Sequence, residues 1–285
     1  WGSIKLGKDL GIFASDAILN DMTLLGVGSG AGGLAGNTTT TGRIGTGFMY
    51  ADWKSQVAYS TPNFNGFSAT VGVTQAWNVN NTIAGATSTG RGGNEPAFEA
   101  KASYDFAADA VKGKVWVSGF TQQVENLNNG TGSSPTALTG AAANDKADAW
   151  DIGANFNAAG FGLTGYYYEG NGIGQTVQLN GGFDVAGNDR NSQGYYVQGT
   201  YALPGVGTKL GVSYGESELK GTGLSAETLN KITDEMWTVG VYHPLTKHLN
   251  LVAEYSEAQH KFDGVSATDT SSKGKTVALG AILFF

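Results

Sequence analysis

The amino-acid sequence predicts an all-β fold, a transmembrane antiparallel up-and-down β-barrel with about twelve strands. Three observations support this fold. Segments in which every second residue is apolar recur from one end of the chain to the other. The connections between these segments alternate between short and long, and aromatic residues gather near the ends of the apolar faces. The 285 residues are expected to form a single barrel domain.

The composition agrees with a chain that meets both lipid and water. It includes 45 Gly, 6 Trp, 12 Tyr and 13 Phe, yet only 14% of the residues are charged, against roughly a quarter in soluble globular proteins. No stretch approaches the roughly 18 apolar residues of a transmembrane helix. The formal charge of −7 argues against nucleic acid as a partner. The absence of Cys excludes disulfides and thiolate metal sites within this sequence.

Period-two alternation is clearest near the C-terminus, where Val277, Leu279, Ala281 and Leu283 share one face with Phe285. Side chains of a strand alternate between its faces, so each such segment is a strand with one apolar and one polar face. The expected strands begin near Ser3, Trp53, Phe67, Ala97, Lys114, Ala149, Phe161, Gly194, Thr208, Met236, Leu249 and Lys275.

The connections favour a barrel over a sandwich. Short turns are expected at 62–66, 107–112, 157–160, 204–207 and 244–248, and long loops at 78–95, 125–146, 170–192, 220–234 and 263–272. An up-and-down barrel keeps the two classes in strict alternation, whereas Greek-key links do not. The aromatic residues expected in interfacial girdles are Trp77, Tyr104, Phe106, Trp150, Phe156, Phe161, Tyr201, Trp237, Tyr255 and Phe285.

Three segments resemble a known family. The last strand, which ends in Phe285, resembles the terminal strand of bacterial outer-membrane proteins, whose final aromatic residue is part of an assembly signal. The segment QVAYSTPNFNGFS, from Gln56 to Ser68, resembles the strand–turn–strand after the constriction loop of Gram-negative general diffusion porins, especially the β-proteobacterial and neisserial type. GSIKLGKD, from Gly2 to Asp9, is similar to the strand that leads into that loop. The resemblance implies a sixteen-stranded barrel, of which this sequence lacks the N-terminal strands.

The connection from residue 9 to residue 51 is expected to be functional, because long loops without regular structure usually are. The resemblance implies that it folds inward, narrows the pore and faces basic residues on the wall. By position, the expected constriction residues are Asp16, Asp21, Lys5, Lys8, Arg43 and Lys54, together with Glu99, Lys101, Lys114 and Asp151, which have inward parity. Such charges would set a field across a narrow aqueous opening and bias ion selectivity.

Other motifs carry weaker signals. The glycines at 26, 28, 30 and 33 lack the strand and helix that a dinucleotide loop needs, so a flexible loop is favoured. His243, His248 and His260 fit turn or rim positions better than a metal site. Asp184, Asn188 and Asp189 offer oxygen ligands that suit calcium, but their spacing matches no EF-hand. No nucleophile elbow is present.

The sequence therefore predicts a porin of the Gram-negative outer membrane, without cofactor, metal or catalysis. As the resemblance implies, it would be a homotrimer in contact with outer-membrane lipid and lipopolysaccharide, and ions and small hydrophilic solutes would diffuse through it passively. Two alternatives stay open. One is a substrate-selective sugar or organic-anion channel, in which Tyr166, Tyr168 and Tyr196 would stack against the solute. The other is a plugged barrel that acts as an enzyme or an adhesin.

Overall fold

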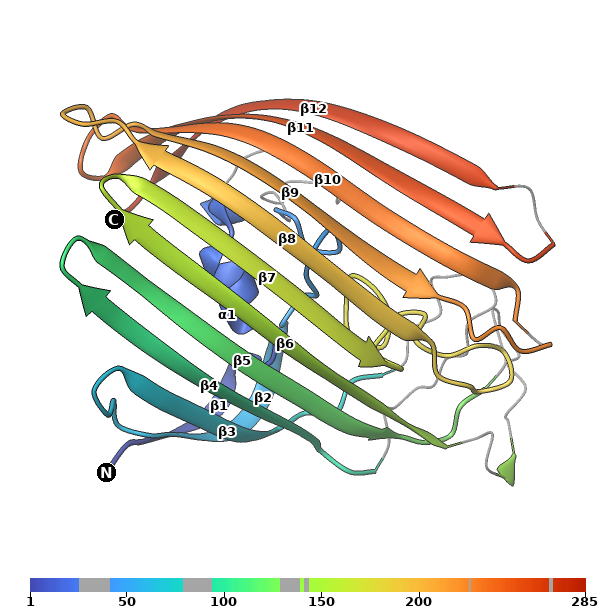
Figure 1. Ribbon diagram of the computed structural model, residues 1–285. Helices are drawn as coiled ribbons and strands as arrows, with labels where there is room; N and C mark the ends of the chain where they lie inside the picture. Colours follow the sequence, from blue (N-terminus) through green and yellow to red (C-terminus); the bar gives the residue numbers. More distant parts are fainter. Residues whose placement is uncertain (26–41, 79–93, 129–138, 141–143, 226, 267–268) are drawn as a thin grey trace.

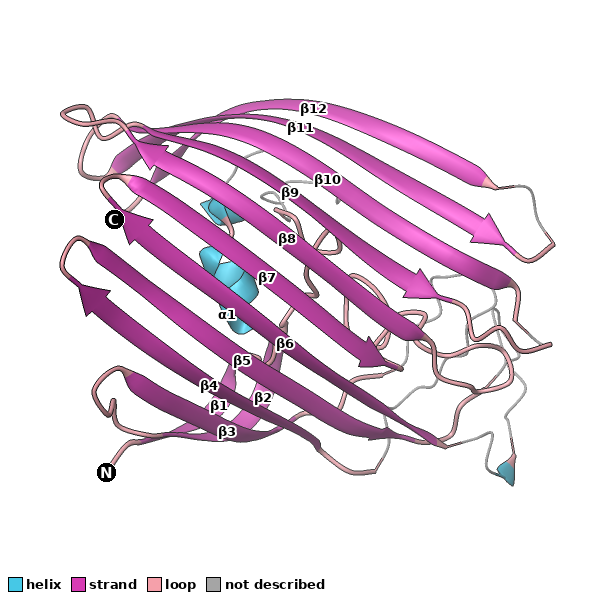
Figure 2. Ribbon diagram, in the orientation of Figure 1, coloured by secondary structure: helices cyan, strands magenta, loops and turns pink. Residues whose placement is uncertain are grey.

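The computed structural model describes residues 1–25, 42–78, 94–128, 139–140, 144–225, 227–266 and 269–285 (Figure 1). In these residues a single sheet of twelve strands follows the order of the sequence, and every neighbouring pair is antiparallel. The sheet curves around a short helix, α1, which lies on its concave side (Figure 2). This confirms the predicted up-and-down topology.

The strands from β4 to β12 are long enough to cross a bilayer, while β1, β2 and β3 have eight residues each. Their bounds are β1 Ser3–Leu10, β2 Trp53–Ser60, β3 Phe67–Thr74, β4 Ala97–Ala108, β5 Val111–Val124, β6 Asp145–Ala158, β7 Phe161–Asn171, β8 Asn191–Ala202, β9 Lys209–Lys220, β10 Leu229–Pro244, β11 Leu249–Gly264 and β12 Thr270–Leu283. Helix α1 spans Ser15–Asn20, and a 3₁₀ turn, η1, spans Met22–Leu25. A tilted strand needs about 9–11 residues to span the membrane, so the 16-residue strands β10 and β11 project past it.

All twelve predicted strands are present. The predicted alternation of short and long connections holds for every connection but the last: residues 265–269, between β11 and β12, form a shorter connection than the short turn at 61–66, because both strands extend into the predicted loop. Short turns and both termini lie at one end of the sheet, and long connections lie at the other (Figure 1). Some strands begin earlier than predicted; β10, for example, begins at Leu229 instead of Met236. The added residues include Lys231, Asp234 and Glu235, and these charged residues interrupt the period-two apolar signal by which a strand is recognised in the sequence.

The outer face of the sheet is apolar and the inner face is polar. In β2, Trp53, Val57 and Tyr59 are exposed on the outer face, while Lys54 and Gln56 are buried on the inner face. The same alternation continues along the central strands β4 to β10. An apolar exterior and a polar interior are the arrangement of a barrel in lipid.

Aromatic pairs on the outer face lie across neighbouring strands. The ring centroids of Phe161 and Tyr201 are 4.4 Å apart where β7 begins and β8 ends, so this pair fits the predicted interfacial girdle. Trp150–Tyr167 and Trp237–Tyr255, with centroids 5.6 Å and 5.1 Å apart, lie near the middle of their strands. Trp77 does not belong to the girdle, contrary to the prediction: its backbone N–H donates to Gln122 Oε1 at 2.8 Å and its ring packs against the interior cluster. Trp77 follows the end of β3, where strand parity no longer sets the direction of a side chain.

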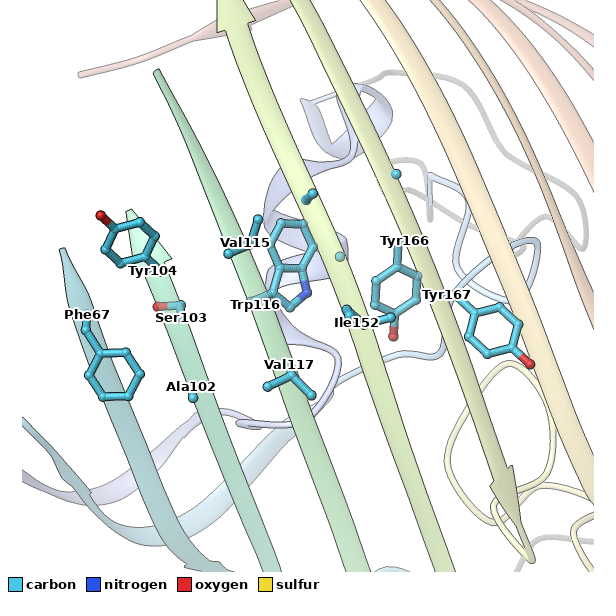
Figure 3. A pocket seen from close by; sticks show the side chains of 13 residues that line it. Phe67, Ala102, Ser103, Tyr104, Val115, Trp116, Val117, Ile152, Tyr166 and Tyr167 are labelled. Atoms are coloured by element: carbon cyan, nitrogen blue, oxygen red, sulfur yellow. The ribbon is translucent and has the colours of Figure 1, made fainter. Parts of the chain in front are cut away.

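An apolar groove runs over the outer face of β3 to β7 (Figure 3). Its walls include Phe67, Tyr104 and Tyr167, and small residues such as Ala102 and Gly165 leave space between them. The groove opens toward the lipid side and not toward the lumen, because its exposed members alternate with the inward residues Trp116 and Tyr166 (Figure 3).

The two edge strands, β1 and β12, do not pair with each other among the described residues. No helix in the described part of the chain has the length and apolar character needed to span a membrane. The apolar core lies between the concave face of the sheet and the segments folded against it, and it includes Phe13, Phe48 and Tyr196.

Gly153 illustrates how tightly the inner wall is packed. A Cβ at this position in β6 would lie 2.1 Å from Cζ2 of Trp116, which is buried on β5. We therefore expect Gly153→Ala to lower the free energy of unfolding by about 1–3 kcal/mol, as overpacked cores do. Gly165→Ala is the control, because nothing lies within 4 Å of a Cβ there. Urea unfolding of the two variants, followed by tryptophan fluorescence, tests this expectation; equal midpoints would contradict it.

Candidate functional site

The chain between β1 and β2 begins by turning inward against β4. Glu99 of β4 accepts hydrogen bonds on Oε2 from the backbone N–H groups of Ile12 at 2.7 Å and Phe13 at 2.8 Å. Both N–H groups are buried and would otherwise be costly to leave unpaired. The described part of this connection, residues 11–25 and 42–52, is called the first inward segment below.

Helix α1 presses one face against the wall of the barrel. Asp16 points to β4 and β5, where it forms ion pairs with Lys101 at 2.8 Å and Lys114 at 2.5 Å. The N–H of Ala14, just before the helix, donates to Asp151 Oδ2 of β6 at 3.1 Å. Four predicted residues, Asp16, Lys101, Lys114 and Asp151, thus meet at one patch of the wall.

The other predicted carboxylate, Asp21, is paired within the first inward segment. Its Oδ1 lies 3.8 Å from Nε of Arg43, and its Oδ2 accepts from Thr23 Oγ1 at 2.7 Å. Arg43 in turn donates to Ser213 of β9 and, at 3.4 Å, to the carbonyl oxygen of Met236 of β10. Both charged side chains are buried, so this pair fastens the segment to the far wall and presents no charge to the lumen.

Lys54 of β2 connects three parts of the interior. Its ammonium group donates to Oε1 of Glu99 and, at 2.6 Å, to Oε1 of Gln178. Both side chains of the Lys54–Glu99 pair are 0% exposed. The ammonium also lies 5.0 Å from the ring centroid of Phe120 and 5.9 Å from that of Trp77, within the range of cation–π attraction.

A second segment, residues 172–190 between β7 and β8, also folds into the interior. Ile173, Leu179 and Phe183 have no exposed surface and belong to the same apolar cluster as Phe13 and Phe48 of the first inward segment. The sequence predicted an outer loop here. The missed signal is the apolar residues spaced through a Gly- and Asn-rich stretch, which an outward loop has no reason to carry. These residues are called the second inward segment.

The three tyrosines proposed for solute stacking are covered. Tyr196 donates from its hydroxyl to the carbonyl oxygen of Ala17 in α1 at 2.9 Å, and Tyr166 donates to Asp151 Oδ2 at 3.0 Å. Tyr166 is 4% exposed, and Tyr168 and Tyr196 are 0% exposed. Their rings form part of the core beneath α1 and do not line an open surface on which a sugar could stack.

Two predicted constriction residues lie apart from this site. Lys5 pairs with Asp9 along β1. Lys8 stands opposite Ser55. Ser55 is exposed on the outer face of β2, between the inward Lys54 and Gln56. Residues directly opposite each other share a face, so Lys8 faces the outside of the barrel. The prediction for Lys8 is therefore wrong, because one residue along a strand reverses the face. The glycines at 26, 28, 30 and 33 lie outside the described residues.

The remaining candidate ligands serve structural contacts. Asp184 accepts hydrogen bonds from the backbone N–H groups of Ala186 and Asn188 and, at 3.0 Å, from Thr222 Oγ1. His243 Nδ1 lies 2.9 Å from Thr208 Oγ1, and His260 Nδ1 lies 2.6 Å from Asp234 Oδ1. Within the described ranges no group of three His, Cys, Asp or Glu residues has the geometry to hold a metal ion.

The surface that the first inward segment turns away from the wall is apolar. Leu19 of α1 is 59% exposed and Leu24 of η1 is 40% exposed. On the wall, the side chains of Lys101 and Lys114 are 22% and 28% exposed, whereas that of Asp16 is 4% exposed. Asp105 of β4, which lies opposite Lys114 on the same face, is exposed. Both ammonium groups and the carboxylate of Asp105 therefore reach the solvent on this wall.

Comparison with known proteins places this architecture in context. The family model described as "Gram-negative porin" matches residues 1–263. No curated protein matches the chain. Among solved structures, the chain is similar to the outer membrane channel DcaP of Acinetobacter baumannii, with a TM-score of 0.67 and 15% identity over 99% of this chain and 72% of that one. It is also similar to an anion-selective porin from Comamonas acidovorans, with a TM-score of 0.54 and 18% identity over 99% of this chain and 74% of that one. A third similar structure is OmpT of Vibrio cholerae, with a TM-score of 0.61 and 16% identity over 100% of this chain and 76% of that one.

The buried Lys54–Glu99 pair gives a direct test of how the site is held. We expect Glu99→Ala to lower the free energy of unfolding by about 3–5 kcal/mol, because it leaves the Lys54 ammonium buried without its counter-ion. The double variant Lys54→Met, Glu99→Leu should recover part of this loss. Asp148→Ala is the control, since its pair with Lys146 is about half exposed and should contribute about 0–1 kcal/mol. Chemical denaturation of the four proteins measures these differences, and equal effects of Glu99→Ala and Asp148→Ala would contradict the expectation.

Proposed function

The chain belongs to the Gram-negative porin family, whose members are outer-membrane channels for passive diffusion, and from this premise we propose that its constriction gives a modest preference to small anions. The observation that carries the proposal is the excess of positive charge at the wall beside α1. Three cations, Lys101, Lys112 and Lys114, share the inward face of β4 and β5. They meet two carboxylates there, Asp16, which is buried, and Asp105, which is exposed opposite Lys114. Three positive and two negative charges leave one positive charge in excess. The Lys54–Glu99 and Arg43–Asp21 pairs are buried, and the charges of the two partners cancel in each pair.

One uncompensated positive charge has a small effect in water. A unit charge about 7 Å from a passing ion contributes about 0.6 kcal/mol at a dielectric constant of about 80. This energy corresponds to a preference of roughly threefold, since about 1.4 kcal/mol is tenfold. Salt reduces it, because the Debye length is about 10 Å at 0.1 M. The printed description of the Comamonas acidovorans protein as anion-selective agrees in direction with this proposal.

The functional assembly is also part of the proposal. Unpaired strand edges are not tolerated in hydrocarbon, so we infer that further strands close the barrel between β1 and β12, as in a sixteen-stranded porin of the β-proteobacterial and neisserial type. A trimer is the proposed oligomer, because one OmpT structure of Vibrio cholerae is described as a trimer form. The apolar outer face and its aromatic pairs suit contact with outer-membrane lipid, including lipopolysaccharide.

The reversal potential of the purified, reconstituted protein in a low-salt gradient tests the anion preference. We expect its sign to report anion selectivity and the conductance to rise in multiples of three. Lys101→Gln with Lys114→Gln should move the reversal potential toward cations, and adding Asp16→Asn removes the carboxylate left unpaired by that change. Lys247→Gln is the control, because Lys247 is exposed in the turn between β10 and β11. A cation-selective wild type, or variants that behave like the control, would contradict the proposal.

A further inference from the structure

The two inward segments are joined through their backbones. The N–H of Tyr50 donates to the carbonyl oxygen of Thr176 at 2.9 Å, and Tyr50 and Val177 form a parallel β-bridge. The side chain of Gln178 extends this contact in both directions: Oε1 accepts from Lys54 Nζ at 2.6 Å, and Nε2 donates to the carbonyl oxygen of Tyr50 at 3.4 Å. The second inward segment is therefore bonded to the point where the first one returns to β2.

The second inward segment is internally closed. Backbone hydrogen bonds of 2.6 Å from Leu179 to Ile173 and of 2.7 Å from Arg190 to Gly182 fold it back on itself. Only glycine fits at Gly182, because a Cβ there would lie 2.0 Å from the carbonyl oxygen of Gly172. A segment with its own hydrogen bonds and a buried apolar side, including Phe183, can act as a rigid brace.

Two anchors hold this brace, one to the connection between β9 and β10 and the other to β9 itself. Arg190 forms a buried bidentate pair with Glu227, with distances of 2.8 Å from Nε to Oε2 and 2.5 Å from Nη2 to Oε1. Burial alone would raise the pKa of Glu227, but hydrogen bonds from Arg190 and from backbone N–H groups lower it to about 2. Gln175 Nε2 donates to the carbonyl oxygen of Ser217 in β9 at 3.2 Å.

We propose that the second inward segment, residues 172–190, is a second constriction element that fixes the position of the first inward segment through Gln178 and the Tyr50–Val177 bridge. Without it, residues 42–52 keep the Arg43 anchor on β9 and β10 but lose their support beside β2. The width of the pore is then set by both inward segments, which are far apart in the sequence, and not by the first alone.

This inference requires that the chain conducts, as the family does, and is independent of any preference for anions. Loss of the brace lets the first inward segment move away from the wall at its β2 end. The cross-section available to ions and uncharged solutes therefore changes, while the ion pairs of Asp16 that set the charge at the wall stay in place.

Single-channel recording of Gln178→Ala tests the proposal. We expect a conductance above that of the wild type, with greater open-channel noise, and entry of larger polyethylene glycols into the pore. The matched control is Gln259→Ala, because Gln259 bonds to Ser271 on the outside of the barrel. Heat-modifiable migration on gels verifies that each variant is folded.

A tether distinguishes bracing from a general loss of packing. The sequence contains no Cys, so Tyr50→Cys and Val177→Cys can be added to Gln178→Ala to form a single disulfide across the bridge. Bridge partners lie within the distance that a disulfide can span. Oxidation should return the conductance and the size limit to wild-type values, and reduction should raise them again in the same protein.

The outcomes distinguish failure of the channel activity from failure of the proposed brace. A wild type without conductance would overturn the channel activity on which the inference rests. A conducting wild type whose Gln178→Ala variant is unchanged would overturn the brace. An altered conductance that the oxidised tether does not restore would also overturn it, because the change would then arise from the disturbed Lys54–Glu99 pair.

Discussion

The buried ion pair between Lys54 and Glu99 is the interaction on which the interior of this barrel depends. Moving two charges out of water is costly, and the attraction between them compensates only when the remaining hydrogen-bonding capacity is also used. Here Glu99 accepts hydrogen bonds from the backbone N–H groups at the start of the first inward segment, and Lys54 donates a hydrogen bond to Gln178 of the second inward segment. One pair thus joins strand β2, strand β4 and both inward segments, so neither segment is an independent loop.

Ion pairing of the other charged residues determines which charged groups the lumen exposes to solutes. Asp16 and Asp21 of the first inward segment turn toward cations of the wall or of the segment itself, and they are buried in doing so. The surface left facing the solvent includes apolar Leu19 and Leu24, the partly exposed ammonium groups of Lys101 and Lys114, and the carboxylate of Asp105 opposite Lys114. The net charge of −7 of the whole sequence therefore does not predict the charge that the pore presents.

The sheet could be predicted from the sequence, and much of the interior could not. Period-two patterning is a local signal, and it located every strand and the inward parity of Glu99, Lys101 and Asp151. Whether Asp16 faces the lumen or the wall depends on partners about a hundred residues away, which no local pattern encodes. Lys8 shows how one residue reverses a face, and the second inward segment has the composition of an outer loop because turns need glycine wherever they lie.

The most direct test is an experimental structure of the protein in lipid, determined by electron cryo-microscopy. The account predicts that residues 172–190 lie within the barrel, with side-chain density connecting Lys54 to both Glu99 and Gln178. A map in which these residues extend outward from the rim, with Lys54 bonded to Glu99 alone or exposed to solvent, would contradict it.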